Sequence, residues 1–313
     1  MWLYVTRRVL ATFPVMGVVA AIVFLMLRMS PGDPAAIIAG DNASVEDIAQ
    51  IREHLGLDRP LVEQFVRWLG QLAVGDLGTS IYLDRPVLGL ILERVEPTLA
   101  LSISTMTFAV ILAIPMGVLA AWRAGSWIDQ SIMALSVLAF SVPVFLIGYG
   151  LVIGFSLTLD LLPVQGFVSL SEDPLAFFRH LVLPTVALGL VYTALLARIT
   201  RATMLETLNE DFVRTARAKG LAEPRVLILH ALKNASVPIV TTIGTGIALL
   251  IGGVVVTESV FAVPGIGRLT IDAVLQRDYP VIQGVILTIA GVYVLVNLAI
   301  DLTYSLLDPR IRY

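Results

Sequence analysis

The chain has 313 residues, of which 57% are hydrophobic and 14% are charged, and its formal net charge is −3. Soluble domains carry about 25% charged residues, so this composition predicts an integral membrane protein. Because the sequence contains no cysteine, it excludes disulfides, thiol nucleophiles and cysteine-ligated metals. The three histidines have no metal-ligand spacing. We expect a lipid bilayer around the chain and no nucleic acid among its partners.

Six apolar runs without a charged residue predict six transmembrane helices. Each is near or above the roughly 20 residues that cross a bilayer, and the fourth is the shortest. Several contain a proline, which transmembrane helices tolerate when neighbouring helices cover the freed carbonyl group. In chain order the runs are Val9–Leu27, Pro97–Trp122, Gln130–Leu159, Leu181–Ala197, the run between Lys233 and Thr257, and Tyr279–Ile300.

The first run is interpreted as a retained helix, since it is too long for the apolar core of a secretory signal. Segment 29–96 follows it and predicts a small extracytoplasmic helical insertion. Ser44-Val45-Glu46-Asp47 resembles a helix start, and apolar residues recur at helical spacing after it. We expect the glycines of Gly75-Asp76-Leu77-Gly78 to end the second helix of this insertion.

The lysine and arginine distribution predicts that both chain ends are cytoplasmic. With the N-terminus inside, the inside segments (1–8, 122–129, 198–236 and 301–313) hold 12 Lys and Arg in 68 residues. The outside segments (29–97, 158–180 and 257–280) hold 8 in 116 residues. The predicted fold is therefore an all-α polytopic membrane protein with six transmembrane helices, N-in and C-in.

Catalytic and nucleotide-binding motifs are absent from the sequence. A P-loop needs Gly-Lys-Ser/Thr, yet the two lysines lie in Ala218-Lys219-Gly220 and Leu232-Lys233-Asn234. There is no HExxH and no GxSxG. We therefore expect the chain not to be an enzyme and to hold no cofactor or metal, so that any energy comes from a partner or an ion gradient.

Polar residues near the ends of the last run raise the alternative of ion coupling. Asn297 and Asp301 lie four apart near its inner end, and Gln283 lies near its outer end. We favour interfacial capping and helix packing as their role, because ion-coupled carriers place ionisable groups near the midplane and no charged residue interrupts the six runs.

The longest polar interruption on the predicted inner side, Asn209 to Pro238, predicts two helices joined by a glycine turn. Asn209 is the expected N-cap of the first helix, which runs from Glu210 to Lys219. Gly220 is expected to close that helix in a left-handed conformation. Pro224 is expected to begin the second helix, which ends near Asn234. Such a hairpin is either a docking element or a surface turn.

On the predicted outer side, Glu258 to Gly267 reads as an apolar turn with two glycines. Taken alone, this segment is more often structural than functional. Pro264, Gly265 and Gly267 are its expected turn residues, and Arg277-Asp278-Tyr279-Pro280 is expected to open the last helix.

Several blocks together resemble the permease subunits of ABC importers, most closely the dipeptide, oligopeptide and nickel group. The cytoplasmic "EAA" loop of that family resembles Thr215-Ala216-Arg217-Ala218-Lys219-Gly220-Leu221 followed by His230-Ala231-Leu232-Lys233-Asn234-Ala235. Arg214 stands where the general pattern has Glu, which is similar to the peptide group. The resemblance covers nearly the whole chain through further blocks, namely Pro31-Gly32-Asp33-Pro34, Leu55 to Leu61, Gly75 to Ser80, Arg85-Pro86-Val87, Glu258 to Phe261, Pro264 to Gly267, Arg277 to Pro280 and Asp308 to Tyr313.

This resemblance implies a transmembrane subunit of a peptide importer in the cytoplasmic membrane of a prokaryote. Its implied partners are a second homologous permease, two P-loop ATPase subunits that bind ATP and Mg, and an extracytoplasmic binding protein. The implied domains are 1–28 with the first helix, 29–96 as the insertion, and 97–313 as a core with the coupling loop at 198–236. The implied ATPase-coupling residues are Arg214, Thr215, Ala216, Arg217, Ala218, Lys219, Gly220 and Leu221.

Three questions stay open on the sequence. Dipeptides, longer peptides, glutathione-like peptides and nickel chelates are all transported by permeases of this appearance. The alternative functions are an ion-coupled secondary transporter and a non-transporting membrane scaffold. Pore-lining residues are not distinguished, because the helices are hydrophobic on all sides.

Overall fold

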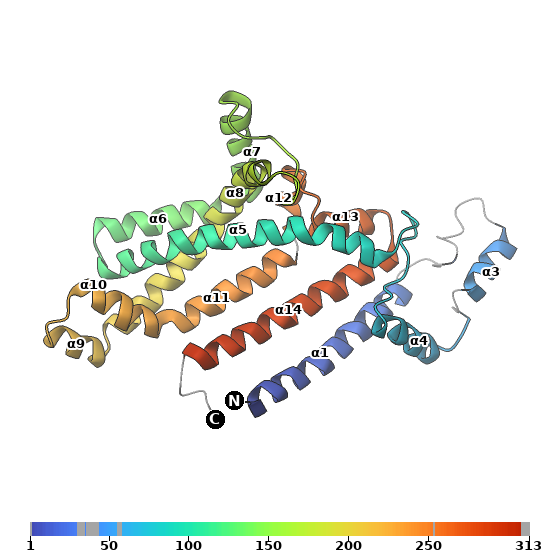
Figure 1. The fold of residues 1–313 in the computed structure, drawn as a ribbon, viewed down its shortest axis with the longest axis horizontal. Coiled ribbons are helices and arrows are strands. Elements are labelled where there is room, and N and C mark those ends of the chain that lie inside the picture. The colour runs from blue at the N-terminus through green and yellow to red at the C-terminus, as the bar shows by residue number, and fades with distance from the viewer. Residues whose placement is uncertain (1, 30–34, 36–43, 55–57, 253, 308–313) are drawn as a thin grey trace. The chain divides into compact units, whose positions relative to one another are not determined.

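The structure is a computed structural model that describes residues 2–29, 35, 44–54, 58–252 and 254–307. Within these ranges the regular elements are helices, with one isolated antiparallel bridge between Thr79 and Pro86. This confirms the all-α class. In chain order (Figure 1) the elements are α1 (Trp2–Met29), α3 (Val45–His54), α4 (Leu61–Ala73), α5 (Val87–Trp122), α6 (Trp127–Ser141), α7 (Val144–Leu151), the π-helix η1 (Val152–Thr158), α8 (Pro174–Leu208), α9 (Asp211–Ala218), α10 (Glu223–Arg225), the π-helix η2 (Val226–Leu232), α11 (Lys233–Ile251), α12 (Val255–Val260), α13 (Ile266–Leu275) and α14 (Tyr279–Leu307).

Among the described residues, five helices are long and apolar enough to span a membrane, and a sixth span exists only if one bent pair counts as a single span. The five are Arg8–Met26, Val87–Trp122, Pro174–Leu208, Glu223–Ile251 and Tyr279–Thr303. The chain is thus a multi-pass membrane protein. The sidedness of its ends remains a prediction. The parts of the family-like blocks at 31–34, 55–57 and 308–313 lie outside the described residues.

The third predicted run is broken rather than straight. Helices α6 and α7–η1 meet at an angle of 95°, and Figure 1 shows α7 turning away from the line of α6. Proline disfavours the helical conformation for the residue before it, and Val142 is extended here, with φ −83° and ψ 125°. The break therefore lies at Val142–Pro143, where the sequence permitted a continuous helix.

Helix α8 is much longer than its charge-free run, because Arg179, Arg198 and Arg201 lie within it. Its start is fixed by Asp173, whose Oδ1 accepts hydrogen bonds from the backbone N–H groups of Leu175 and Ala176 at 2.9 and 3.1 Å. At 1.5 Å per residue its 35 residues extend about 50 Å, more than the roughly 30 Å of a bilayer core.

Two compact units make up the chain, and each is described separately. The first comprises residues 1–8, 94–268 and 292–313. Here α5, α8 and α11 share a core that includes Leu101, Leu188 and Leu250. Close approach needs small residues: a side chain at Gly117 would lie 2.8 Å from the Ala197 carbonyl oxygen on α8.

The second unit comprises residues 9–93 and 269–291. The aromatic rings of Phe65 and Trp68 on α4 lie 5.1 and 5.5 Å from the ring of Phe24 on α1, so α4 packs by one apolar face. Ser80 and Asp278 are both buried and hydrogen-bonded to each other, which holds the loop before α5 at the start of α14. Helices α3 and α4 form where the sequence predicts helices.

Candidate coupling site

The predicted coupling segment folds as a short helix, α9, between α8 and a glycine turn. The predicted N-cap was wrong: Asn209 is the C-cap of α8, and Glu210 is the N-cap of α9, without a side-chain capping bond. Asn209 belongs to the end of α8, because its Nδ2 donates to the Leu205 carbonyl oxygen at 2.9 Å. Only two residues thus separate the two helices, so α9 is attached closely to the end of α8.

Gly220 closes α9 in the left-handed conformation that the sequence predicts, with φ +77°. The N–H of Gly220 donates to the Arg217 carbonyl at 2.9 Å, and the N–H of Leu221 donates to the Ala216 carbonyl at 3.4 Å. These are the two bonds of a Schellman motif, with Lys219 as the C-cap. A residue with a Cβ atom is strained in this conformation, so glycine is the residue that the turn favours.

The predicted coupling residues divide into a buried and an exposed set. Val213, Ala216 and Val226 form a small core with Leu221 packed against it. The exposed set consists of Arg214, Thr215, Arg217, Ala218, Lys219 and Gly220. The predicted coupling residues did not include Phe212, a residue of α9 that is 40% exposed. The inward spacing of Val213 and Ala216 on a helix would have placed its neighbour Phe212 off the buried face.

One ion pair joins the two sides of the hairpin, and a second lies within α9. The Arg217 guanidinium forms two hydrogen bonds with the Glu223 carboxylate, at 2.7 and 3.2 Å, and this interaction raises the pKa of Arg217. Arg214 pairs with Asp211 at 3.0 Å within the same helix. Arg217 therefore joins the two sides of the turn, while Lys219 lies exposed beside the glycine.

The second helix of the hairpin begins as predicted but does not end near Asn234. Pro224 lies in the first turn of α10, which continues through η2 into α11 and ends at Ile251. Asn234 is not a stop, because its Nδ2 donates to the His230 carbonyl within the helix at 2.6 Å. Below the turn, Leu227 and Ala231 pack with Met204 of α8, so the hairpin and the end of α8 form one packed body.

The predicted outer turn is organised around a buried carboxylate. Glu258 on α12 is 0% exposed, and its Oε2 accepts the backbone N–H of Arg268 at 2.7 Å. Its Oε1 accepts the Thr98 hydroxyl at 3.3 Å, and the Thr98 Oγ1 accepts the N–H of Ile266 at 2.8 Å. Burial raises the pKa of Glu258, and the N–H of Arg268 is the largest influence that opposes this rise.

Gly265 permits this arrangement, because a Cβ atom there would collide with the Glu258 carboxylate. Pro264 precedes it between α12 and α13, and the backbone N–H of Gly267 also bonds Glu258. The outer turn thus encloses the Glu258 carboxylate between backbone N–H donors and the start of α13. Sequence reasoning proposed a simple apolar turn and missed Thr98, which lies 160 residues away.

The polar residues that suggested ion coupling all have hydrogen-bond or ion-pair partners. The Asp301 carboxylate pairs with Arg8 at 2.5 Å. Asn297 donates to the Tyr293 carbonyl at 2.9 Å, and Gln283 donates to the Val23 carbonyl at 3.2 Å. These contacts favour the packing interpretation. In the part of the chain that the structure describes, no group of three or more His, Asp or Glu residues could hold a metal ion.

Comparison with known families decides the class. Residues 113–313 match the family described as the binding-protein-dependent transport system inner membrane component. The chain belongs to this family. Residues 1–113 match its N-terminal companion family. The chain is therefore the transmembrane component of an ABC importer, a family that implies ATPase subunits and a binding protein as partners.

Curated relatives match along the whole length. A probable peptide ABC transporter permease protein (y4tP) of Sinorhizobium fredii is 51% identical, and the match covers 100% of both chains. A putative peptide transport system permease protein of Brucella abortus is 44% identical, covering 99% of this chain and 98% of the relative. The glutathione transport system permease protein GsiC of Escherichia coli is 42% identical, with 99% of each chain covered.

A solved structure supports the fold. The MetNI methionine ABC transporter, in an inward-facing conformation, has a chain that matches with a TM-score of 0.58 and 18% identity. The match covers 71% of this chain and 97% of that chain, which shows a shared fold.

Proposed function

We propose that this chain is the transmembrane subunit of an importer that moves peptides across the cytoplasmic membrane of a prokaryote. The assignment of peptides as the substrate is supported by the full-length similarity to permeases named for peptide and glutathione transport. The partners in this proposal are a second homologous permease, two P-loop ATPase subunits that bind ATP and Mg, and an extracytoplasmic binding protein.

In this proposal an ATPase subunit binds the exposed surface of α9. This helix is a rigid knob, because the Schellman turn, the apolar core under Val213 and Ala216, and the Arg217–Glu223 pair hold it from three sides. A rigid knob transmits displacement, whereas a flexible loop absorbs it. Closure of the ATPases would then rock the helices that continue from the hairpin, chiefly α8 and α11.

The proposed grouping of the loops into two sets, one on each side of the membrane, is supported by long-range polar contacts, each of which joins segments predicted to lie on the same side. Arg8 with Asp301 and Asp129 with Arg201 join segments assigned to the cytoplasm. Ser169 with Glu96 joins segments assigned to the outside. A pairing between segments assigned to opposite sides would have contradicted the N-in, C-in arrangement.

Proteoliposomes test the function directly. The chain, purified with its ATPase and permease partners and supplied with binding protein, is expected to accumulate alanyl-alanine, trialanine or glutathione when ATP is present on the ATPase side. Collapse of the proton and sodium gradients should leave the uptake unchanged. Uptake that follows an ion gradient without ATP would favour a secondary transporter, and absence of uptake of all three peptides would contradict the peptide substrate.

A further inference from the structure

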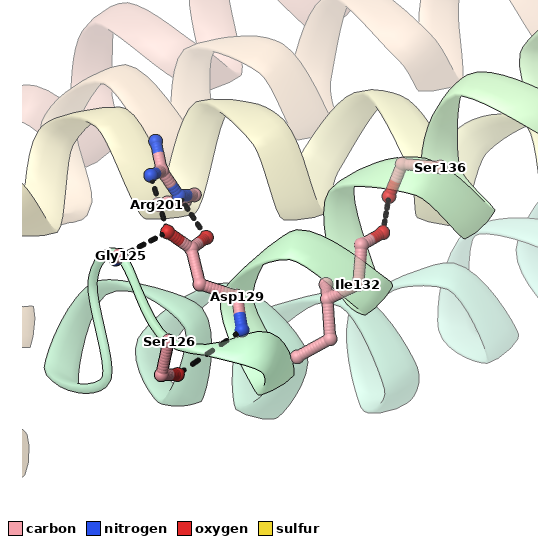
Figure 2. A network of polar contacts seen from close by, with 6 residues as sticks. All are labelled: Gly125, Ser126, Asp129, Ile132, Ser136 and Arg201. Carbon is pink, nitrogen blue, oxygen red and sulfur yellow. Dashed lines mark hydrogen bonds and ion pairs between the residues drawn. The ribbon is translucent and has the colours of Figure 1, made fainter.

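A bidentate ion pair joins α6 to α8 away from the coupling turn. The Arg201 Nε and Nη2 atoms lie 2.5 and 2.6 Å from Asp129 Oδ1 and Oδ2 (Figure 2). Asp129 Oδ2 also accepts the backbone N–H of Gly125 at 2.9 Å. Both carboxylate oxygens are therefore occupied, and the two parallel bonds define the orientation of α6 against α8 as well as its distance.

Burial makes this pair different from the surface pairs of the chain. The Asp129 side chain is 4% exposed and that of Arg201 is 28% exposed. A charge so enclosed is tolerated only with its partner, since removal of either group leaves the other without compensation. The pair is consequently expected to stay closed whenever α6 and α8 are folded together.

The pair also lies where three helices converge. Gly125, with φ +79°, turns the chain between α5 and α6, and Ser126 caps the start of α6. Thr200, the residue before Arg201 on α8, packs against Gly117 of α5 so closely that a Cβ atom at Gly117 would require a shift. The start of α6 and the end of α5 are thus both held to the same stretch of α8.

This stretch leads directly into the coupling helix. From Arg201, α8 continues without a break to Leu208, and α9 starts at Asp211. Met204, one turn beyond Arg201, is fully buried against Leu227 of the hairpin and Ala121 of α5. Between α9 and Arg201 there are thus a two-residue link, the last two turns of α8 and one packed core.

We propose that the Asp129–Arg201 pair is a positioning element of the transport cycle, which makes α6 follow the movement of α8 when the coupling helix is displaced. This proposal rests on the proposed function and extends it beyond the coupling loop. The two residues act through the helices that they join. In their absence, the ATPases would still bind α9 and hydrolyse ATP, but less of that movement would reach α6 and α7, which follows it after the break at Pro143.

The first test compares Asp129→Asn with the wild type in the proteoliposomes described above, with the peptide that the wild type transports. The expected result is at least about a fivefold fall in peptide transported per ATP hydrolysed, the lower end of typical coupling effects, with the ATPases still co-purifying. The matched control is Glu63→Gln, which breaks an exposed ion pair with Arg59. An unchanged ratio in Asp129→Asn would overturn the proposal.

A second test uses the absence of cysteine from this chain. The double variant Asp129→Cys with Arg201→Cys is expected to transport poorly per ATP, and a short bis-maleimide link between the two thiols should restore the ratio. The single-cysteine variants treated with the same reagent are the controls. A link that forms and stops transport would overturn the proposal, because the two helices would then have to separate during the cycle.

A third variant covers the case in which Asp129→Asn does not assemble. Arg201→Lys keeps the charge but replaces two hydrogen bonds of fixed geometry by a single flexible ammonium group. An intermediate ratio of transport to hydrolysis is expected, and a ratio equal to that of the wild type would contradict a positioning role. Failure of the proposed function can be distinguished from failure of this inference. If the proposed function is wrong, the wild type itself transports none of the peptides.

Discussion

Two turns of the same backbone design close helices at the coupling hairpin and at the outer turn. After α9, Gly220 and Leu221 donate to the carbonyl groups of Arg217 and Ala216. After α12, the N–H groups of Ala262 and Val263 donate to Ser259 and Glu258 at 3.4 and 2.8 Å in the same pattern. The residue in the left-handed position is glycine in the first turn, with φ +77°, and alanine in the second, with φ +48°.

The surroundings of the two turns explain the difference. Nothing lies within 4 Å of a Cβ atom placed on Gly220, so the first turn has no neighbours to compensate for strain. The second turn is enclosed by Val260, Phe261 and Val263, which pack against α8. Its backbone is also held from outside, because the N–H of Gly166 donates to the Phe261 carbonyl at 2.9 Å.

A strained backbone persists where its surroundings hold it, and an isolated turn must be stable by itself. The coupling turn therefore depends on the identity of one residue, and the outer turn depends on the buried Glu258 and its donors. This difference predicts that substitutions at the two turns fail in different ways. Outer substitutions should reduce stability, and coupling substitutions should reduce the transmission of movement.

The largest effect is expected for Glu258→Ala. Loss of the carboxylate leaves the N–H of Arg268 and the hydroxyl of Thr98 without this acceptor in a buried site and opens a cavity, which costs about 3 kcal/mol of unfolding free energy. Denaturant titration of the chain in detergent micelles measures it. A loss below about 1 kcal/mol, the net value of an ordinary hydrogen bond, would contradict the central role of this carboxylate.

The same carboxyl group predicts a pH dependence. Burial raises its folded-state pKa above the usual 4.5, so the folded state binds the proton more tightly than the unfolded state. Its contribution to stability is full below pH 4.5 and is lost as the pH rises through the folded-state pKa. The difference in unfolding free energy between wild type and Glu258→Gln should follow this curve, whereas a difference independent of pH would argue against a buried titrating group.

Gly220→Val is expected to have a smaller effect on stability and a large effect on coupling. A β-branched residue in a left-handed position costs at least about 1–2 kcal/mol, and the turn is expected to open rather than accept this strain. Peptide uptake should fall while membrane insertion and abundance stay normal. Gly220→Asn is the matched control, because asparagine tolerates this conformation. Normal uptake by Gly220→Val at normal abundance would refute the assignment.

The smallest effect is expected for Ala262→Gly in the outer turn. Relief of left-handed strain of about 1 kcal/mol is offset by the greater freedom of glycine in the unfolded chain, so the net change should stay below about 0.5 kcal/mol. The same titration measures this change, with the exposed Ser259→Gly as the control. A stabilisation well above that limit would mean that the surroundings of Ala262 do not hold the strained turn.

The sequence predicted features whose cause is local. Gly220 follows a lysine at a helix end, and a glycine there indicates a left-handed turn. The left-handed Ala262 carries no such signal, because alanine normally favours a right-handed helix. The break at Pro143 was permitted by the sequence but not predicted, since transmembrane helices often continue through a proline.

Contacts between distant residues were beyond sequence reasoning. Glu258 is an ordinary acidic residue until Thr98 and the backbone of α13 enclose it. Asp129 and Arg201, 72 residues apart, were counted only as charges on the predicted inner side. Asn209 was assigned to the wrong helix, because a residue between two helices can cap either of them and only the bond to Leu205 decides.

The central claim is that α9 with its glycine turn is the surface by which the ATPases move this chain. Its most direct test is a pull-down from detergent-solubilised membranes, comparing the wild type with a variant that carries Thr215→Glu and Lys219→Glu on the exposed face of α9. These changes leave Val213 and Ala216, and thus the hairpin core, intact. P-loop ATPases are expected with the wild type and not with the variant. Equal recovery of the ATPases with both chains would contradict the claim.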